Sequence, residues 1–173
     1  MGISKKDLQL RALEPTDLDF LYRLENDRAL WTVSNTLVPF SAYTLKEYIT
    51  HSGQDIYSVK QQRFVLSNTE QTPLGCIDLY DFDPQHHRAG VGLVIDKAHR
   101  QKGYATTALE LIEAFAFDQL QLHQLYAGVG EDNQASIRLF QSAGYEHCGL
   151  KKDWNFYCNA YHDELIFQKI ADV

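Results

Sequence analysis

Apolar and polar residues alternate with two different periods in the first part of the chain. Residues 8–13 alternate one by one, which predicts a strand. Residues 18–26 and 41–52 repeat apolar side chains every three or four positions, which predicts two helices. Thr16 precedes the first helix and has an acid three residues on, so we expect it to be the N-cap. Residues 29–40 are apolar and uncharged, and we expect a loop there.

Segments typical of strands dominate the rest of the chain. The predicted strands cover residues 63–67, 74–80, 88–96, 124–129, 145–152 and 161–170, and the predicted helices cover residues 104–120 and 133–143. A polar turn joins the first two strands into an antiparallel hairpin. The strand–helix–strand–helix order that follows requires a parallel pair with a crossover. We therefore expect one domain over residues 1–173, of the α/β (or α+β) class, with a mixed sheet.

The turn after the strand at 88–96 is dense in positive charge, although the chain as a whole is acidic. Four basic residues lie within positions 97–102, whereas the whole chain has a net charge of −7. Gly103 follows them, and glycine tolerates a positive φ and a close approach of ligand to backbone. The N-terminus of the next helix adds unpaired N–H groups and the positive end of its dipole. The sequence therefore predicts a site for a phosphate-bearing cofactor.

The helix predicted at 133–143 carries a second group of candidate site residues. Asn133, Ser136 and Phe140 stand at i, i+3 and i+7 and therefore share one side of the helix. Asn133 can be a simple N-cap, and Gly144 fits the C′ position that ends the helix. A ligand contact for Asn133 is the alternative to this structural interpretation.

A rival motif overlaps the start of this helix. Residues 128–133 read Gly-Val-Gly-Glu-Asp-Asn between a strand and a helix, as a dinucleotide-binding turn would. The third glycine is absent, and two carboxylates stand where a pyrophosphate would bind. The repulsion between these charges argues against a dinucleotide site.

Two segments resemble signatures of the GNAT acetyltransferases. Arg100-Gln-Lys-Gly-Tyr-Ala105 resembles the pyrophosphate-binding turn of that superfamily, R/Q-x-x-G-x-G/A. Residues 133–145 resemble its second signature, N-x-x-[AS]-x-x-x-[YF]-x-x-x-G-[FY]. Residues 10–18, 75–96 and 144–163 are similar to the branch that contains ribosomal-protein N-terminal acetyltransferases and spermidine/diamine acetyltransferases.

This resemblance implies a fold and a cofactor. The fold is a GNAT-like mixed, mostly antiparallel central sheet with a splayed parallel pair, flanked by helices. Acetyl-CoA is the implied co-substrate, and no metal is implied. The splayed strand would bind the pantetheine arm, the basic turn the pyrophosphate, and the second helix would lie along the cofactor. The implied cofactor-binding residues are Leu93, Val94, Ile95, Arg100, Gln101, Lys102, Gly103, Tyr104, Ala105, Thr106, Asn133 and Ser136.

The resemblance also implies direct transfer, in which an amine attacks the thioester carbonyl within a ternary complex. Asp78 is the first candidate for the catalytic base, with an outward-facing strand residue as the structural alternative, and Glu131 is the second candidate. Backbone N–H groups near residues 93–95 would stabilise the oxyanion. Many relatives have a Tyr at the position of Phe140 to protonate the CoA thiolate, and Phe has no proton to give. Ser136, one turn earlier, is the catalytic candidate in its place.

The resemblance implies a primary amine as the acceptor, and we expect a small amine or a peptide N-terminus. Spermidine enzymes of this branch carry two acids in the loop between the first two helices, where this chain has Leu37 and Val38. Trp31, Phe40 and Asp81 are the candidate substrate-binding residues, the two aromatics as an apolar wall or as packing on the sheet. Spermidine or a diamine is the alternative substrate. A non-catalytic CoA-binding sensor or assembly module is the alternative function.

Composition limits the setting in which the protein works. The acidic balance speaks against a general nucleic-acid surface. Three cysteines without a CxxC pair favour a reducing compartment and argue against a zinc site. We see no apolar run near the length of a membrane span. We therefore expect a cytoplasmic protein with no membrane or nucleic-acid partner, and a homo-oligomer is compatible with the sequence.

Overall fold

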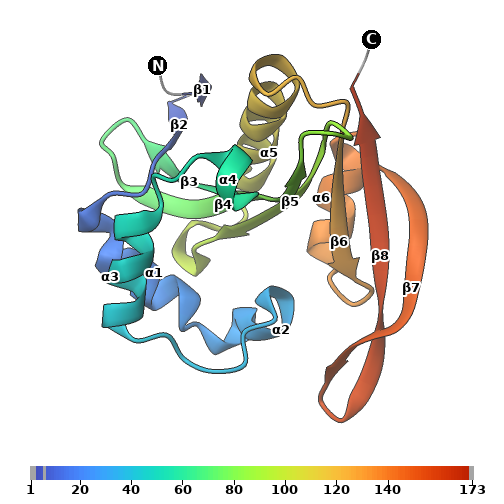
Figure 1. The fold of residues 1–173 in the computed structure, drawn as a ribbon. Helices are drawn as coiled ribbons and strands as arrows, with labels where there is room; N and C mark the ends of the chain where they lie inside the picture. Colours follow the sequence, from blue (N-terminus) through green and yellow to red (C-terminus); the bar gives the residue numbers. More distant parts are fainter. Residues whose placement is uncertain (1–2, 6, 172–173) are drawn as a thin grey trace.

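An eight-stranded sheet organises the part of the protein that the structure describes (Figure 1). The computed structural model describes residues 3–5 and 7–171. Neighbouring strands are antiparallel except for β5 and β6, which are parallel, and their order is β1-β2-β3-β4-β5-β6-β8-β7. The mixed sheet predicted from the sequence is confirmed. The strands are β1 (Ile3–Lys5), β2 (Leu8–Arg11), β3 (Gln62–Asn68), β4 (Pro73–Asp83), β5 (Arg88–Ile95), β6 (Gln124–Gly130), β7 (Glu146–Tyr157) and β8 (Ala160–Ile170).

Helices cover the sheet unevenly. The α-helices are α1 (Leu18–Glu25), α2 (Trp31–Ser34), α3 (Ala42–His51), α4 (Ile56–Val59), α5 (Tyr104–Ala114) and α6 (Gln134–Ser142). Short 3₁₀ turns η1 (Pro15–Asp17), η2 (Arg28–Leu30) and η3 (Lys97–His99) precede α1, α2 and α5, and α5 continues as the π-helical turn η4 (Phe115–Gln119). On the side facing the viewer of Figure 1, β6, β7 and β8 carry no helix.

Two hydrophobic cores lie on opposite faces of the sheet. Val65 and Cys76 point into the core formed with α1 and α3, whereas Leu66 and Ile77 point into the core formed with α5 and α6. This division follows from the strand geometry, because successive side chains point to opposite faces. The buried residues of β6 all belong to the core with α5 and α6. The other face of β6, called the open face below, is therefore free of helix packing.

The parallel pair β5–β6 separates after three residues. Residues 88–90 of β5 pair with residues 124–126 of β6, and no pairing continues through residues 91–95 or 127–130 of the described strands. On its other side β5 remains paired with β4 up to Ile95. The splayed pair implied by the sequence resemblance is confirmed. One edge of β5 and one edge of β6 therefore present backbone groups to a ligand instead of to each other.

Two local predictions differ from the structure. Thr16 is not the N-cap of the first helix, because the turn η1 begins one residue earlier at Pro15, whose fixed φ suits the first helical position. Glu14 is the N-cap residue of η1, and its N–H donates to Asp17 Oδ2 at 2.9 Å; Asp17 is the N-cap residue of α1. Residues 29–40 are not entirely a loop, since η2 and α2 occupy their first half.

A buried ion pair anchors the turn before α1. Asp17 is 3% exposed and accepts two hydrogen bonds from Arg11, at 2.7 and 2.8 Å. Burial raises the pKa of Asp17, but hydrogen bonds from Arg11 and from the Glu14 N–H lower it by more, so the pKa lies below its ordinary value. A carboxyl with a lowered pKa in the folded state stabilises the protein above its unfolded pKa, and this stabilisation is lost as the pH falls.

We expect Arg11→Met to lower the free energy of unfolding by about 3–5 kcal/mol at pH 7, because a buried carboxylate loses its partner. The loss should shrink at about pH 3.5, where the unpaired Asp17 becomes protonated. Urea unfolding at both pH values measures it. Arg23→Met, at an exposed position of α1, is the control and should change stability by less than about 0.5 kcal/mol. Equal losses in the two variants would contradict the role assigned to the ion pair.

Candidate active site

The unpaired edge of β5 forms one wall of the candidate site. Leu93, Val94 and Ile95 pair with β4 on one side and have no strand partner among the described residues on the other. Leu93 and Val94 are half-buried, so their backbone lies at the boundary between the core and the surface. A ligand with peptide-like amides can hydrogen-bond to the edge of β5 where pairing with β6 has ended.

The turn after β5 directs the chain into α5 by a fixed set of backbone contacts. The Asp96 side chain accepts from the Ala98 N–H at 3.1 Å and caps η3. Arg100 Nε donates to the Ile95 carbonyl at 2.9 Å, which ties the turn to the end of the splayed strand. Gln101 and Gly103 both have positive φ, 62° and 78°. The chain therefore reverses sharply just ahead of the helix.

The N-terminus of α5 has no side-chain cap. Gly103 is its N-cap residue, and the helical ladder starts with the Thr107 N–H donating to the Gly103 carbonyl at 3.2 Å. The N–H groups of Tyr104, Ala105 and Thr106 precede that bond and are oriented out of the helix end. Arg100 and Lys102, in the turn that leads into the helix, add positive charge near this end. The pyrophosphate contacts predicted for these residues stay a prediction. The predicted residues 100–106 are thus brought together in one turn.

Asn133 and Ser136 lie at the start of α6, next to the free end of β6. The Asn133 side chain accepts from the Ser136 N–H at 3.1 Å, so Asn133 is the N-cap. Ser136 is half-buried on the first turn. Gly144 follows the helix with a φ of 84°, which confirms the predicted C′ position.

Phe140 is part of the hydrophobic core. It is 4% exposed, packs edge-on against Tyr145 at 5.0 Å between ring centroids, and stacks on Phe167 at 6.3 Å. The ring offers no proton donor to a leaving group. The role of proton donor predicted for Ser136, one turn earlier, stays a prediction.

Asp78 belongs to a charged network on the open-face side of β4. Both of its carboxylate oxygens accept from Arg63, at 2.7 Å from Nε and 2.9 Å from Nη2. Arg63 also pairs with Glu25 at the end of α1 and lies 5.6 Å from the ring centroid of Tyr48. The network has one cation and two carboxylates, so its net charge is −1. Asp78 stands opposite Gly92 of the splayed strand in the strand register.

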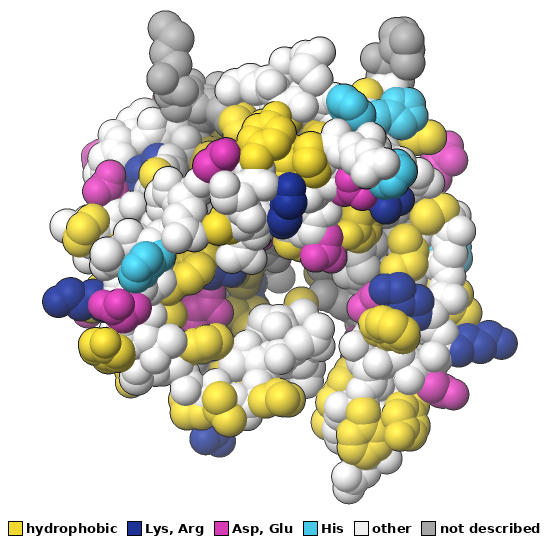
Figure 2. Space-filling view, in the orientation of Figure 1, with side chains coloured by type: hydrophobic (Ala, Val, Ile, Leu, Met, Phe, Trp, Pro, Cys, Tyr) yellow, Lys and Arg dark blue, Asp and Glu magenta, His cyan; other side chains and the backbone are white. Residues whose placement is uncertain are grey.

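The aromatic candidates Trp31 and Phe40 lie on the segment that follows α1. Trp31 Nε1 donates to the Glu25 carbonyl at 3.0 Å. Asn26 holds the backbone of Phe40 with two hydrogen bonds, of 2.8 and 3.0 Å, and the Phe40 side chain packs on the core with α1 and α3. Both residues are therefore fixed to the end of α1, close to Glu25. In the space-filling view, the surface is hollowed between α2 and the β7–β8 hairpin (Figure 2).

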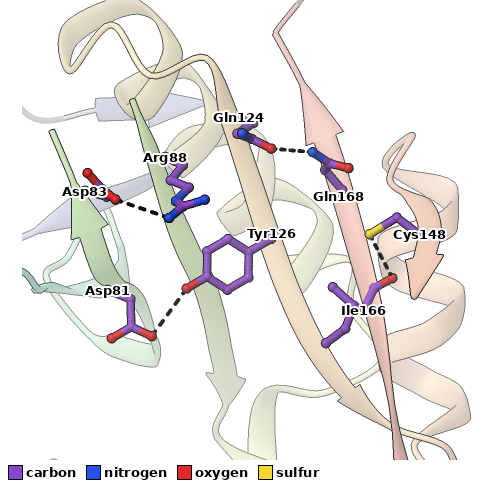
Figure 3. Close-up of a pocket in the computed structure, with 8 residues that line it drawn as sticks. All are labelled: Asp81, Asp83, Arg88, Gln124, Tyr126, Cys148, Ile166 and Gln168. Carbon is purple, nitrogen blue, oxygen red and sulfur yellow. Dashed lines mark hydrogen bonds and ion pairs between the residues drawn. The ribbon is translucent and has the colours of Figure 1, made fainter. Parts of the chain in front are cut away.

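The third substrate candidate, Asp81, lines a cavity of about 460 Å³ on the open face (Figure 3). Tyr126 donates to Asp81 Oδ2 at 3.3 Å, and Arg88 pairs with Asp83 at 3.3 Å in the same cavity. Burial, followed by the charge of Asp81, raises the pKa of Tyr126 to about 12. The cavity lies beside the paired part of β5 and β6, and neither Trp31 nor Phe40 is among the residues that line it.

Sequence reasoning missed Arg63 and Glu25 as members of the site. Arg63 could have been found, because pairing the predicted hairpin strands outward from their polar turn brings it opposite Asp78. Glu25 gives no such signal, since its approach to Arg63 depends on how α1 packs on the sheet.

The family model described as acetyltransferase (GNAT) domain matches residues 7–146 of this chain. The chain belongs to the GNAT acetyltransferases. Spermidine N(1)-acetyltransferase of Vibrio cholerae serotype O1 is 26% identical over 159 residues, which cover 90% of this chain and 88% of that protein. The putative ribosomal N-acetyltransferase YdaF of Bacillus subtilis is 27% identical over 167 residues, which cover 94% and 90%.

The fold comparison agrees with the family assignment. The crystal structure of spermidine N-acetyltransferase from Vibrio cholerae in complex with CoA and spermine matches with a TM-score of 0.87 and 26% identity, over 96% of each chain. The predicted fold class and the predicted enzyme class, an acetyl-CoA-dependent N-acetyltransferase, are confirmed.

Neither a metal site nor a membrane-spanning helix is found in the part of the chain that the structure describes. Among the described residues, no group of three or more His, Cys, Asp or Glu side chains could hold a metal ion. No helix in the described part of this GNAT chain is long and apolar enough to cross a membrane.

We expect Gly103→Glu to raise the Kd for acetyl-CoA by more than about 100-fold. The variant places a carboxylate at the predicted pyrophosphate site and forces a side chain into the left-handed region, which costs about 1–2 kcal/mol for a non-glycine residue. Isothermal titration calorimetry measures the affinity. Gly53→Glu introduces the same charge at an exposed position with no atom within 4 Å of the new Cβ, and should bind as the wild type does. Unchanged binding by the Gly103 variant would contradict the assignment of the turn.

Proposed function

We propose that this GNAT enzyme transfers the acetyl group of acetyl-CoA to a small primary amine or a peptide N-terminus in a ternary complex. One observation carries the proposal: β5 and β6 diverge after three paired residues, and the freed strand β5 runs directly to the uncapped N-terminus of α5. This arrangement supports binding of a cofactor that has amides at one end and a pyrophosphate at the other. The acceptor then approaches from the open face.

In this proposal the chain contributes backbone groups more than side chains to cofactor binding. Residues 93–95 bind the pantetheine arm and donate an N–H to the oxyanion, since donors fixed in advance stabilise the charge that develops there. Residues 100–106 bind the pyrophosphate. Asn133 and Ser136 contact the cofactor from the start of α6, and Ser136 protonates the departing thiolate.

Electrostatics favours a cationic acceptor near Asp78. A primary amine arrives as an ammonium ion, and the network of Glu25, Arg63 and Asp78 carries a net negative charge beside the splayed strand. In this proposal Asp78 lies next to the amine and attracts it; its predicted role as the base stays a prediction. Both oxygens of Asp78 accept hydrogen bonds from Arg63. Asp78 therefore attracts the ammonium ion by its negative charge, since uptake of a proton by Asp78 would break one of these hydrogen bonds.

The segment after α1 favours a small or peptidic acceptor. Trp31 and Phe40 form an apolar wall beside the charged network, and Leu37 and Val38 are 90% and 67% exposed on the same segment. A long polycation would need carboxylates spaced along its path. Asp81 supplies one and is already bonded to Tyr126.

Spermidine is the second candidate acceptor. The named spermidine acetyltransferases among the relatives favour it, and so does the pair of carboxylates, Asp81 and Asp83, in the open-face cavity. These two carboxylates could bind the distal ammonium group of a polyamine once the hydrogen bond from Tyr126 to Asp81 and the ion pair of Arg88 with Asp83 are broken.

The test is an assay of CoA release from acetyl-CoA with a panel of amines: spermidine, a diamine, a monoamine and a short peptide with a free N-terminus. We expect release that requires an amine and is faster with the monoamine or the peptide. Efficient, saturable turnover of spermidine would overturn the preference against polyamines. Tight acetyl-CoA binding without amine-dependent release would favour the non-catalytic sensor.

We expect Ser136→Ala to lower kcat by about 100-fold, the low end of the range for general acid catalysis, because a thiolate can also leave without a proton. The KM for acetyl-CoA should stay within a factor of about two. The Asn133 side chain accepts from the backbone N–H of residue 136, so the substitution leaves the helix cap intact. Steady-state kinetics with the best amine of the panel measures both constants. Ser142→Ala, at an exposed position of the same helix, is the matched control. An unchanged kcat would remove Ser136 from the mechanism.

We also propose a homo-oligomer located in the cytoplasm. The β7–β8 hairpin exposes Trp154, Phe156 and Tyr161, with 58%, 61% and 64% of their surfaces accessible, and neighbouring exposed aromatics often mark a contact surface. Light scattering coupled to gel filtration gives the number of subunits.

A further inference from the structure

Two polar side chains from opposite sides of the splay converge over Gly128 of β6. Glu164 reaches Gly128 from β8, and Tyr80 reaches it from β4, across β5. Gly128 lies two residues beyond the last paired residue of β6, at the point where the two strands have separated. Both side chains are on the open face, from which the acceptor approaches in the proposed function.

Glu164 occupies space that only a glycine leaves free. A Cβ at position 128 would lie 2.8 Å from Glu164 Oε1 and 3.3 Å from Oε2. Lys151 of β7 pairs with Oε1 at 2.9 Å, and the Glu164 side chain is 15% exposed. Oε2 has no hydrogen-bond partner among the described residues. Glu164 is therefore a fixed, largely buried carboxylate with one oxygen free to accept a proton.

Tyr80 fills the space above the two glycines of the splayed strand. A Cβ at Gly90 would lie 2.2 Å from the Tyr80 ring, and one at Gly92 would lie 3.6 Å from it. Burial raises the pKa of Tyr80, a hydrogen bond with the Gly128 backbone opposes this shift, and the charge of Glu164 adds to it. The hydroxyl therefore stays protonated at neutral pH and lies close to both Gly128 and Glu164.

The two carboxylates singled out from the sequence are less available than Glu164. Asp78 accepts from Arg63 with both oxygens. Glu131 accepts from the Asp163 N–H at 3.1 Å and faces His162 at 3.6 Å with the same oxygen, Oε1. Its side chain is 46% exposed, whereas that of Glu164 is 15% exposed, so Glu131 is held less firmly by its surroundings.

We propose that Glu164 is the general base of the transfer and that Lys151 positions it; this rests on the proposed function. The ammonium N–H bond breaks, and the proton moves to Glu164 Oε2. The freed lone pair of the amine forms the C–N bond with the acetyl carbonyl carbon. The carbonyl π pair moves to the oxygen and returns as the C–S bond breaks, and the C–S electron pair leaves on the CoA sulfur. The nitrogen gives up its second proton to become the amide N–H, and the sulfur takes up one proton through the Ser136 hydroxyl, so one proton in all remains on Glu164.

The experiment is the pH dependence of kcat/KM for the panel amine with the highest turnover, from pH 6 to 10, in the wild type and in Glu164→Gln. At pH 7 we expect the variant to lose about 10²–10⁴-fold, the range for a general base, with an unchanged Kd for acetyl-CoA. The defect should shrink toward pH 10, where the amine is already neutral. A structural role would give a defect that does not depend on pH.

Lys151→Met provides a second, independent measurement. Lys151 on β7 pairs with Glu164, and the charge of Glu164 acts on Tyr80 of β4 together with the charges of Asp81 and Asp78. Removal of the lysine cation makes the carboxylate harder to ionise, so the acid limb of the profile should move to higher pH. This measurement decides the question if Glu164→Gln does not fold.

Glu146→Gln, an exposed position of β7, is the matched control and should retain wild-type kinetics. A wild-type enzyme without amine-dependent CoA release would overturn the proposed function, and the present inference with it. An active wild type with an unaffected Glu164→Gln, or with an unmoved acid limb in Lys151→Met, would overturn this inference alone. Loss of the acid limb in Asp78→Asn rather than in Glu164→Gln would do the same.

Discussion

The separation of β5 from β6 is the constraint on which the rest of the structure depends. A parallel pair normally satisfies its backbone groups along its whole length, and a buried polar group without a partner costs about 1–3 kcal/mol. Here the pairing stops at Gly90 and Tyr126, and Tyr80 lies over the strand beyond that point. The hydrophobic cores on the two faces of the sheet hold both strands in place, since Val91 and Ile95 of β5 and Ala127 and Val129 of β6 are buried in the core with α5 and α6. The splay is therefore built into the packing of the fold.

Charge is arranged so that two substrates of opposite sign meet at this opening. The chain carries −7 overall, yet four basic residues lie within the turn at 97–102, next to the dipole of α5. On the open face, Glu25 and Asp78 outnumber Arg63. A polyanionic cofactor and a cationic acceptor are therefore attracted to different ends of the splay, which reduces competition between them for one binding surface.

The sequence predicted those features that depend on local patterns. The period of apolar residues placed the main strands and helices, and the basic turn with Gly103 indicated the anion site, because a strand, a turn and a helix N-terminus are contiguous in the chain. The N-cap predicted at Thr16 was wrong because the helical turn already begins at Pro15. The loop predicted at residues 29–40 was partly wrong because helical turns as short as η2 and α2 leave no clear period of apolar residues. Contacts between distant strands were invisible: Glu164 meets Gly128 only through the pairing of β6 with β8, and Glu25 meets Arg63 only through helix packing.

The contact between Tyr80 and Gly90 couples the side-chain volumes that these two positions can hold. The Tyr80 ring occupies the volume that a side chain at position 90 of β5 would need, since a Cβ at Gly90 would lie 2.2 Å from it. A larger residue at one position is compatible with the fold only if the other becomes smaller. Grafting the acceptor site of a relative onto this chain must therefore exchange β4 and β5 together, and homologues are expected to divide into those that carry the bulk on β4 and those that carry it on the splayed strand.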